Sequence, residues 1–570
     1  MVSSWFKKGK NLLLAPQATI LSAATIIMLM NLVARLSGLI RLRVLGHYFI
    51  DEELALFFAA FRLPDLVFEV FTLGALSSAF IPVFARTFHK KQKEAWITAG
   101  RVVNFGLIVF LGFYLVFGLF AHSLYALIAP GFSGPETETI AYLARVLFAA
   151  QGFFVVSYVM TGVLESLKRF VVPALAPLFY NLGIILGTIL FAPSLGLLAP
   201  AIGVVIGALA DFLVQLPVAY KLGFRFRFEL KAGKNVKRIG KLATPRMIEL
   251  GILQIAKTVE LFLASLISTP AYTYYNFALS VQALPVGLFG LSIAKAALPT
   301  LAHYSNEPKK LKTVFLTSLY QISFFVIPVV MGMIVLRIPI VRLLFGTHLF
   351  DWSATVQTGY VLSAFALGVF FQSVLLLLTR SFFALHDTKT PLIVSVIGVI
   401  VNVMVSLVLV LGLGMSTWAL ALSYSINNAF QAVILYFLLS RRLNGGSLFA
   451  LTPIFKHTLS AFLSGSVMFI TLKFFDRSVW VKRLSFITNI QSLKTLNFEN
   501  FVLDTRYSAN LLLLTVITAI LGGIVYLAIN ALLRTSELQV FLRVLKHRKF
   551  TIPPKEGESV SPVASDTSGI

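Results

Sequence analysis

The sequence contains no cysteine, and only 12% of its 570 residues are charged. The first absence excludes disulfides, thiol catalysis and Cys-based metal sites. The second separates the chain from soluble domains, in which about 25% of residues are charged. There is also no Walker A loop, no GxSxG and no HExxH motif, so neither an ATPase nor a hydrolase is indicated. These absences leave transport or binding functions, together with a membrane-embedded transferase, which needs only a few polar residues.

Long apolar segments dominate what the sequence does contain. Hydrophobic residues make up 58% of the chain and the mean hydropathy is +0.88, values typical of a polytopic membrane protein. We count fourteen segments long enough to cross about 30 Å of hydrocarbon as helices, so we predict an all-α membrane fold. The predicted spans are 19–40, 54–85, 98–129, 138–164, 171–195, 198–220, 244–269, 272–302, 313–346, 354–385, 391–413, 416–440, 456–475 and 509–533.

Basic residues alternate with the spans. Loops after even-numbered spans contain Lys and Arg, such as Lys90, Lys309 and Arg441, whereas a loop such as APGFSGPETET has none. Because basic loops face the cytoplasm, this pattern predicts that both termini are cytoplasmic. It also accounts for the net charge of +25 without nucleic acid as a partner. The basic segment 476–508 is the exception, and it either follows the membrane interface or forms a solvated outer loop.

An internal repeat relates the two parts of the chain. Prolines and asparagines recur inside or beside the spans at a nearly fixed offset. The pairs are Pro82 and Pro299 (217 residues apart), Pro173 and Pro391 (218), Pro64 and Pro285 (221), and Asn181 and Asn402 (221). Each copy begins after an even number of spans, so the copies are parallel, and two six-helix lobes are expected with the cargo site between them.

The repeat divides the chain into five parts. We predict an N-terminal lobe at 1–222, a basic cytoplasmic linker at 223–243 and a C-terminal lobe at 244–445. Two appended helices occupy 446–535. The last part, 536–570, is predicted to be a basic and then disordered cytoplasmic tail, because its end is short of large apolar residues.

Arginines in the first two spans are the candidate cargo-binding residues. Arg35, Arg41 and Arg62 lie in or beside apolar segments, where an Arg normally faces a cavity or a partner. Guanidinium groups match the geometry of phosphate oxygens, so an anionic cargo is expected. For Arg41, an interfacial anchor is an equal alternative. Asp65 and Glu69 could instead neutralise Arg62 from the same helix.

A polar stripe marks the seventh span. Glu249, Lys257 and Glu260 fall within about 80° of arc on a helix, and a one-sided polar stripe faces a bundle interior. We therefore consider these residues as a proton- or cation-coupling site centred on Glu260. The alternative is an ion pair between Lys257 and Glu260 that neutralises itself. Na⁺, H⁺ and the membrane potential remain equal choices for coupling, and no other cofactor is expected.

Four segments resemble one transporter family. They are RLSGLIR with FFAAFRLPDL and GALSSAFIPVFA, APGF followed by LKRFVVPALAP, ALPVGLFGLSIAKAALPTLA, and RSFFALHDTKTP. Their order and spacing are similar to those of the MurJ (MviN) family, the lipid II flippases of the multidrug/oligosaccharidyl-lipid/polysaccharide exporter superfamily. The resemblance implies fourteen helices in two lobes plus two extra helices. Arg35, Arg41 and Arg62 match the family's cavity cations, and Glu260 matches a span-seven carboxylate.

The resemblance also implies a function and a location. The chain would move the undecaprenyl-diphosphate-linked peptidoglycan precursor, lipid II, from the inner to the outer leaflet of a bacterial plasma membrane by alternating access. It would act as a monomeric transporter rather than an enzyme, in contact with membrane lipids and with peptidoglycan synthesis enzymes as further partners. A flippase for another polyprenyl-linked glycan, a small-molecule exporter and a scaffold for envelope enzymes are the alternatives.

The chain departs from the family pattern at several charged positions. In span two, Phe68, Glu69 and Leu73 stand where the family has two arginines and a Glu. Leu42 replaces an Asp after the GLIR motif, and Leu279 begins the pair that replaces Asp-Arg in span eight. One of these positions, Glu69, has changed the sign of its charge.

Overall fold

A computed structural model describes residues 20–74, 79–230, 233–443, 451–477 and 502–547. Within these ranges the chain is helical and forms no β-strand beyond an isolated bridge between Asp476 and Leu503. This is the outcome expected for apolar segments in lipid, where every backbone N–H and C=O must find a partner inside its own segment. The fold class predicted from the sequence is therefore confirmed.

The helices overlap the predicted spans, but several of the spans are divided among two or more helices. The first part contains α2 (Ile20–Tyr48), α3 (Asp51–Ala60), α4 (Arg62–Val67), η1 (Phe68–Leu73), α5 (Ile81–Lys90), α6 (Gln92–Leu119), α7 (Ala121–Ile128), α8 (Gly134–Ser166), α9 (Val171–Leu195) and α10 (Leu198–Lys221). The second contains α11 (Lys234–Ile267), α12 (Ala271–Pro285), η3 (Val286–Gly290), α13 (Leu291–His303), α14 (Pro308–Val335), α15 (Arg337–Phe345), α16 (Trp352–Ala384), α17 (Lys389–Leu407), η4 (Val408–Gly412) and α18 (Trp418–Arg442). The last contains α19 (Leu451–Phe475), α22 (Ser508–Leu532) and α23 (Ser536–His547).

Twelve helices of the described residues are long and apolar enough to cross a membrane. The predicted count of fourteen is not confirmed. The first predicted span falls on α2, whose start borders residues outside the description, and the second is divided among α3, α4, η1 and α5. One break in span two lies at Phe61, between α3 and α4, because Pro64 has no backbone N–H to donate to the carbonyl four residues earlier. The tail residues 548–570 and most of the loop 476–508 lie outside the described residues.

The bounds of the helices repeat at the offset that the sequence predicts. The first residues of α8 and α16 are separated by the same offset as Pro173 and Pro391, and so are their last residues. The bounds of α6 and α14 differ by a slightly shorter offset. The π-helical segments η1 and η3 start at the offset of α8 and α16, and each follows its recurring proline closely. Because π segments are rare and mark functional bends, their recurrence points to one bend in each half.

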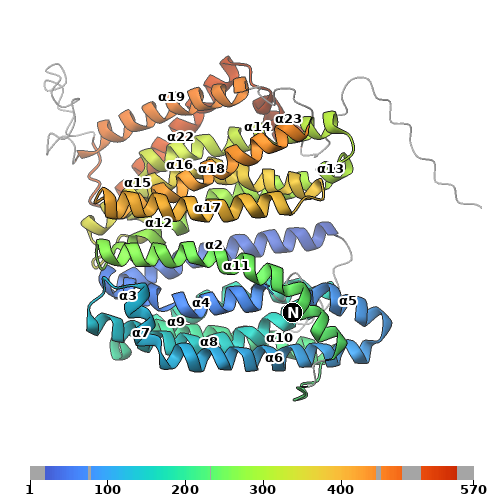
Figure 1. The fold of residues 1–570 in the computed structure, drawn as a ribbon. Coiled ribbons are helices and arrows are strands. Elements are labelled where there is room, and N and C mark those ends of the chain that lie inside the picture. The colour runs from blue at the N-terminus through green and yellow to red at the C-terminus, as the bar shows by residue number, and fades with distance from the viewer. Residues whose placement is uncertain (1–19, 75–78, 231–232, 444–450, 478–501, 548–570) are drawn as a thin grey trace, which may run out of the picture.

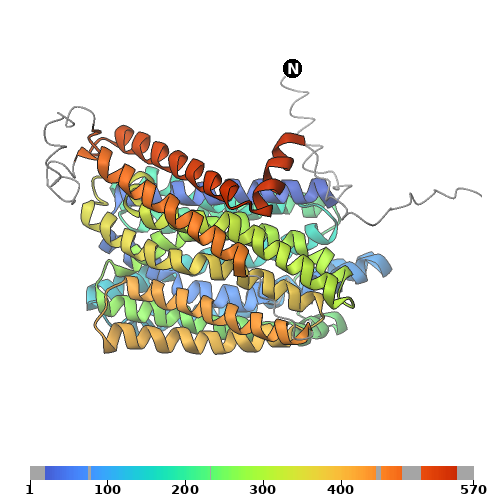
Figure 2. The ribbon, with the colours of Figure 1, turned by 90° about the horizontal axis from the view of Figure 1, so that it is seen from above.

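Figure 1 shows the two halves side by side. Helices α3 to α10 gather on one side, α12 to α18 on the other, and α2 and α11 run between them. The view turned by 90° shows α19 and α22 along the outer edge of the second half (Figure 2). One apolar cluster runs through both halves, with members such as Phe57, Phe148 and Phe277. Where the two halves meet, the first helix of each half (α2 or α11) lies against the other half.

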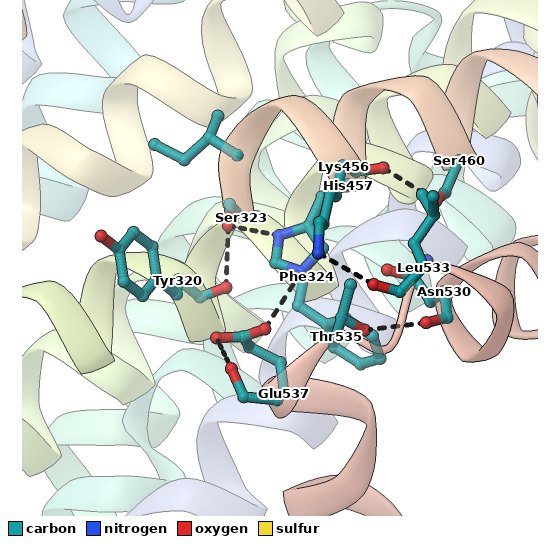
Figure 3. A network of polar contacts seen from close by, with 12 residues as sticks. Tyr320, Ser323, Phe324, Lys456, His457, Ser460, Asn530, Leu533, Thr535 and Glu537 are labelled. Atoms are coloured by element: carbon teal, nitrogen blue, oxygen red, sulfur yellow. Dashed lines mark hydrogen bonds and ion pairs between the residues drawn. The ribbon is translucent and has the colours of Figure 1, made fainter. Parts of the chain in front are cut away.

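Helix α23 is an element that sequence analysis did not predict. Its first residues close a polar network against α14 and α19 (Figure 3). The Nδ1 atom of His457, which is fully buried, lies 2.8 Å from Oγ of Ser323, and its Nε2 atom lies 3.4 Å from Glu537. Tyr526 donates to the carbonyl of Phe324 at 2.8 Å. These contacts fasten the appended helices to the second half.

Polar contacts join loops that the charge pattern assigns to one side. Arg442 and Asp387 form an ion pair at 2.8 Å, although they belong to different predicted cytoplasmic loops. At the same predicted side, Arg101 binds Glu229 of the basic linker at 3.1 Å. The segments that follow predicted spans ten and twelve therefore lie together at one end of the helices.

Candidate functional site

Arg35 lies on α2 and reaches across to the second half. Its side chain is exposed, and its Nη1 atom donates to the carbonyl of Ala283 at 2.7 Å. The acceptor lies near the end of α12, directly before the π segment η3. Gly287 makes this approach feasible, because a Cβ atom there would lie 2.6 Å from Cζ of Arg35. Arg35 thus joins the two halves at the bend.

Arg41 and Arg43 take different positions on the same helix. The guanidinium of Arg41 lies 5.5 Å from the ring centroid of Tyr180, within its own half. Its Nε atom is buried and has no hydrogen-bond partner among the described residues. Arg43 instead donates to the carbonyl of Leu343 at 2.8 Å in the second half. The predicted cations therefore do not converge on one point in this conformation.

Arg62 is the start of a chain of polar contacts between the halves. It is only 5% exposed, and it donates to Gln254 of α11. Gln254 in turn donates to Glu69 of η1, whose two carboxylate oxygens each lie 2.9 Å from Nζ of Lys257. The two acidic residues on the helix of Arg62 have other polar contacts: Asp65 accepts a hydrogen bond from Gln151 at 3.3 Å, and Glu69 pairs with Lys257. The Nε atom of Arg62 is buried without a partner in the described part.

The three polar residues of the α11 stripe contact three different neighbours. Glu249 pairs with Arg246 of its own helix at 2.6 Å. Lys257 binds Glu69 of the first half rather than Glu260, so the self-neutralising pair considered from the sequence is wrong. Glu260 points into the second half, where it is 8% exposed. The three residues therefore serve different contacts although they share one face.

Glu260 of α11 and Asn402 of α17 form a buried polar pair. The amide nitrogen of Asn402 donates to Oε1 of Glu260 at 3.4 Å. The Oδ1 atom of Asn402 is buried and has no partner among the residues described. Carboxylate and amide oxygens suit a hard cation, and this orphaned oxygen fits such a ligand. No group of three or more His, Cys, Asp or Glu that could hold a metal ion occurs in the described part.

A second set of contacts closes the halves at one end. Thr273 of α12 donates to the carbonyl of Asp51 at 2.7 Å, and Tyr274 donates to the carboxylate of the same residue. Nearby, Thr347 donates to the carbonyl of Gly46 at the end of α2. By the predicted topology this end is the outer one, because it follows the first crossing.

Sequence reasoning missed three features of this site. It assigned no role to Gln254 of α11, and it did not predict that Gly287 leaves space for Arg35. It did not predict the contact between Asp51 and Tyr274. The recurring prolines before η1 and η3 were the available signal for the bends, because Pro removes a backbone donor where a π segment begins.

Comparisons with known proteins agree on one family. Residues 47–490 match the family described as "Lipid II flippase MurJ". A relative named "Probable lipid II flippase MurJ" from Rhizobium meliloti (strain 1021) is 32% identical over 371 residues, which cover 62% of this chain and 68% of the relative. A relative of the same name from Borreliella burgdorferi is 25% identical over 476 residues, covering 81% and 91%.

Solved structures share the fold. One described as "Lipid II flippase MurJ, inward closed conformation" has a TM-score of 0.73 at 24% identity and covers 92% of this chain and all of that one. An inward-facing multidrug resistance MATE family transporter of the MOP superfamily has a TM-score of 0.61 at 16% identity, covering 72% and 94%. At these identities the structures establish architecture only. The match over residues 47–490 and the relative from Rhizobium meliloti show that the chain belongs to the MurJ family of lipid II flippases.

Proposed function

We propose that this protein is a lipid II flippase, which moves the diphosphate-linked precursor from the inner to the outer leaflet by alternating access. Family membership supports the cargo, and the repeated halves support the mechanism. The observation that carries the proposal is the crossing of cations between the halves: Arg35 binds the carbonyl of Ala283, and Arg62 binds Gln254. An anion that enters between the halves would meet these donors.

The unsatisfied donors support an anionic cargo. The Nε atoms of Arg41 and Arg62 are both buried without partners in the described residues. A buried donor without a partner costs about 1–3 kcal/mol, and more when it is charged. Oxygens of a diphosphate would satisfy such donors with charge-assisted hydrogen bonds. Part of the cost of desolvating the cargo would therefore be offset by groups that already lack partners.

Contacts at the predicted outer end support alternating access. Thr273 and Tyr274 both hold Asp51, Thr347 holds Gly46, and Arg43 holds Leu343. Even at the about 0.5–1.5 kcal/mol of a neutral hydrogen bond, four of them contribute roughly 2–6 kcal/mol, and the two that involve the Asp51 carboxylate and the Arg43 guanidinium contribute more. This is the size of the gap between two conformations that a ligand can reverse. In the described conformation the outer end would be shut.

Glu260 and Asn402 would supply the coupling. A Na⁺ ion or a proton bound between them would add positive charge to a buried carboxylate, and Na⁺ would also give Oδ1 of Asn402 a partner. One charge moved through the membrane potential is worth about 2.3 kcal/mol per 100 mV. That energy is comparable with the cost of breaking the outer contacts, so either ion could drive the conformational cycle in a bacterial plasma membrane with both termini in the cytoplasm.

The experiment is complementation of a bacterium depleted of its own lipid II flippase. Lipid II in the outer leaflet is measured with an externally added toxin that cleaves it. We expect restored growth and cleavage with the wild type, and loss of both with Arg35→Ala or Arg62→Ala. The control is Glu307→Gln with Lys310→Gln, which removes an exposed ion pair of 3.0 Å far along the chain from these residues.

Two results would contradict the proposal. Normal transport by both arginine variants would refute the role of the cations. A well-inserted wild type that exposes no lipid II would refute lipid II as the cargo, and another polyprenyl-linked glycan would then take its place.

A further inference from the structure

The first helix of each half directs polar side chains to the π segment, η1 or η3, of the other half. In the first half, α2 directs Arg35 to the segment around η3. In the second half, α11 directs Gln254 and Lys257 to Glu69 in η1. The last residues of α2 and α11 are as far apart in the sequence as Arg35 and Gln254. Gln254 is therefore the equivalent of Arg35 in the second half. Lys257 lies three residues further, one turn along the same face.

The two bends receive these side chains in complementary ways. Glu69 and Gly287 occupy equivalent positions in the repeat, because each is the second residue of its π segment, η1 or η3. At Gly287 the missing side chain leaves space for the guanidinium of Arg35, which binds a backbone carbonyl. At Glu69 a carboxylate occupies the corresponding position and holds the ammonium of Lys257. At each of these two π segments, therefore, a cation from one half meets the other half.

Lys257 remains available to another anion. Its side chain is 47% exposed and that of Glu69 is 29% exposed. An ion pair with this much solvent contact contributes little to stability, so a phosphate can compete for the ammonium. A lysine ammonium is a compact point charge with three donors, and it binds phosphate without the fixed geometry that a guanidinium requires. The contact with Glu69 uses both carboxylate oxygens at 2.9 Å, but it is reversible.

We propose that Lys257 is a cargo-binding residue, the counterpart of Arg35 in the second half. Glu69 holds its ammonium when no cargo is present, and the diphosphate of the lipid-linked precursor takes it over when cargo enters between the halves. This proposal rests on the proposed function. It differs from the role of a coupling site predicted for Lys257 from the sequence. It also explains how the chain keeps a cation beside η1 although position 69 is acidic.

A competing explanation is that Lys257 only neutralises Glu69. The two explanations differ in a double variant. If neutralisation is the only role, Glu69→Gln with Lys257→Gln restores cargo binding to the wild-type level. If Lys257 binds the diphosphate, the double variant binds the cargo as poorly as Lys257→Gln alone. Glu69→Gln alone then binds the cargo at least as tightly as the wild type, because Glu69 no longer holds the ammonium of Lys257.

The test measures binding to the purified full-length protein in nanodiscs. The probes are lipid II, undecaprenyl diphosphate and undecaprenol, which has no phosphate. We expect Lys257→Gln, and the double variant equally, to weaken binding of both diphosphates at least fivefold. Undecaprenol binding should not change in either variant. Glu307→Gln with Lys310→Gln is the control, since it removes a similar Lys–Glu pair at the start of α14.

A second measurement separates a lost charge from a damaged fold. The chain has no cysteine, so Glu69→Gln with Lys257→Cys carries a single thiol. Reaction with an aminoethyl methanethiosulfonate restores a positive charge at position 257, and a neutral methyl reagent does not. We expect only the aminoethyl reagent to restore diphosphate binding, and bound lipid II to protect the thiol from reaction.

The outcomes distinguish this inference from the proposed function. Wild-type affinity in the double variant, with lipid II bound normally, would overturn the role of Lys257 and leave the flippase proposal intact. Binding of undecaprenyl diphosphate but not lipid II by the wild type, with loss in Lys257→Gln, would overturn the cargo and support Lys257. If the wild type binds neither diphosphate, both proposals fail.

Discussion

Loosening the outer end should shift the protein toward the conformation that opens outward. Thr273→Val removes a neutral hydrogen bond to the carbonyl of Asp51, and Tyr274→Phe removes one to its carboxylate. A neutral bond contributes about 1 kcal/mol and one to a charged group about 1.5–3 kcal/mol. The double variant should therefore lose roughly 2.5–4 kcal/mol of closure. Since about 1.4 kcal/mol is tenfold, the ratio of closed to open protein falls by roughly 60- to 700-fold.

Distance measurements between spin labels would detect this change. The absence of cysteine allows labels at Glu138→Cys and Ser353→Cys, exposed positions near the starts of the repeat-related helices α8 and α16. We expect a longer label-to-label distance to gain population in the double variant and to be minor in the otherwise unchanged chain. An identical distance distribution in both proteins, with the variant folded and inserted, would refute the claim that these hydrogen bonds keep the outer end shut.

Three further predictions test other parts of the structure. Gly287→Ala should displace Arg35 from its carbonyl partner and lower lipid II exposure in the toxin assay severalfold at normal expression; unchanged exposure would show that this contact is dispensable. Glu260→Gln should abolish the dependence of transport on a Na⁺ or proton gradient, measured in proteoliposomes, and retained dependence would place coupling elsewhere. Asp387→Asn should cost up to about 1 kcal/mol, because it removes the carboxylate whose pKa is held below its usual range by hydrogen bonds from Thr390 and which pairs with Arg442. That stability is complete above the usual pKa of about 4 and is lost as pH falls through the lowered value, so thermal melts of wild type and variant should converge in acid. A difference in acid as large as at pH 7 would contradict the role of the carboxylate charge.

The helices and the repeat could be predicted from the sequence because lipid leaves the backbone few choices. A long apolar segment must satisfy its own polar groups, so its length and composition determine that it is a helix. The offset between Pro173 and Pro391 predicted the relation between α9 and α17, whose first residues are separated by that same offset. The breaks inside span two were not predicted, because hydropathy does not register where a hydrogen-bond ladder changes its spacing.

The partners of the polar residues could not be predicted in the same way. Glu249 and Glu260 share a helical face, but eleven residues separate them by about 16 Å along the axis. At different depths a helix between two halves meets different neighbours, so Glu249 stays with Arg246 and Glu260 reaches Asn402. Angular position therefore predicts that a residue faces the interior, and the packing of both halves decides what it meets there.

The same reasoning explains the reversed charge at Glu69. Considered alone in the sequence, an acidic residue where the family has an Arg weakens the argument for an anionic cargo. In the fold, Glu69 faces α11, and Lys257 supplies the cation that span two lacks. Gln254 links this pair to Arg62, so the change at position 69 leaves positive charge on both sides of it. Under the proposed function the cargo meets both halves at once, so a charged position in a two-lobed transporter is best judged by the electrostatics of the facing pair.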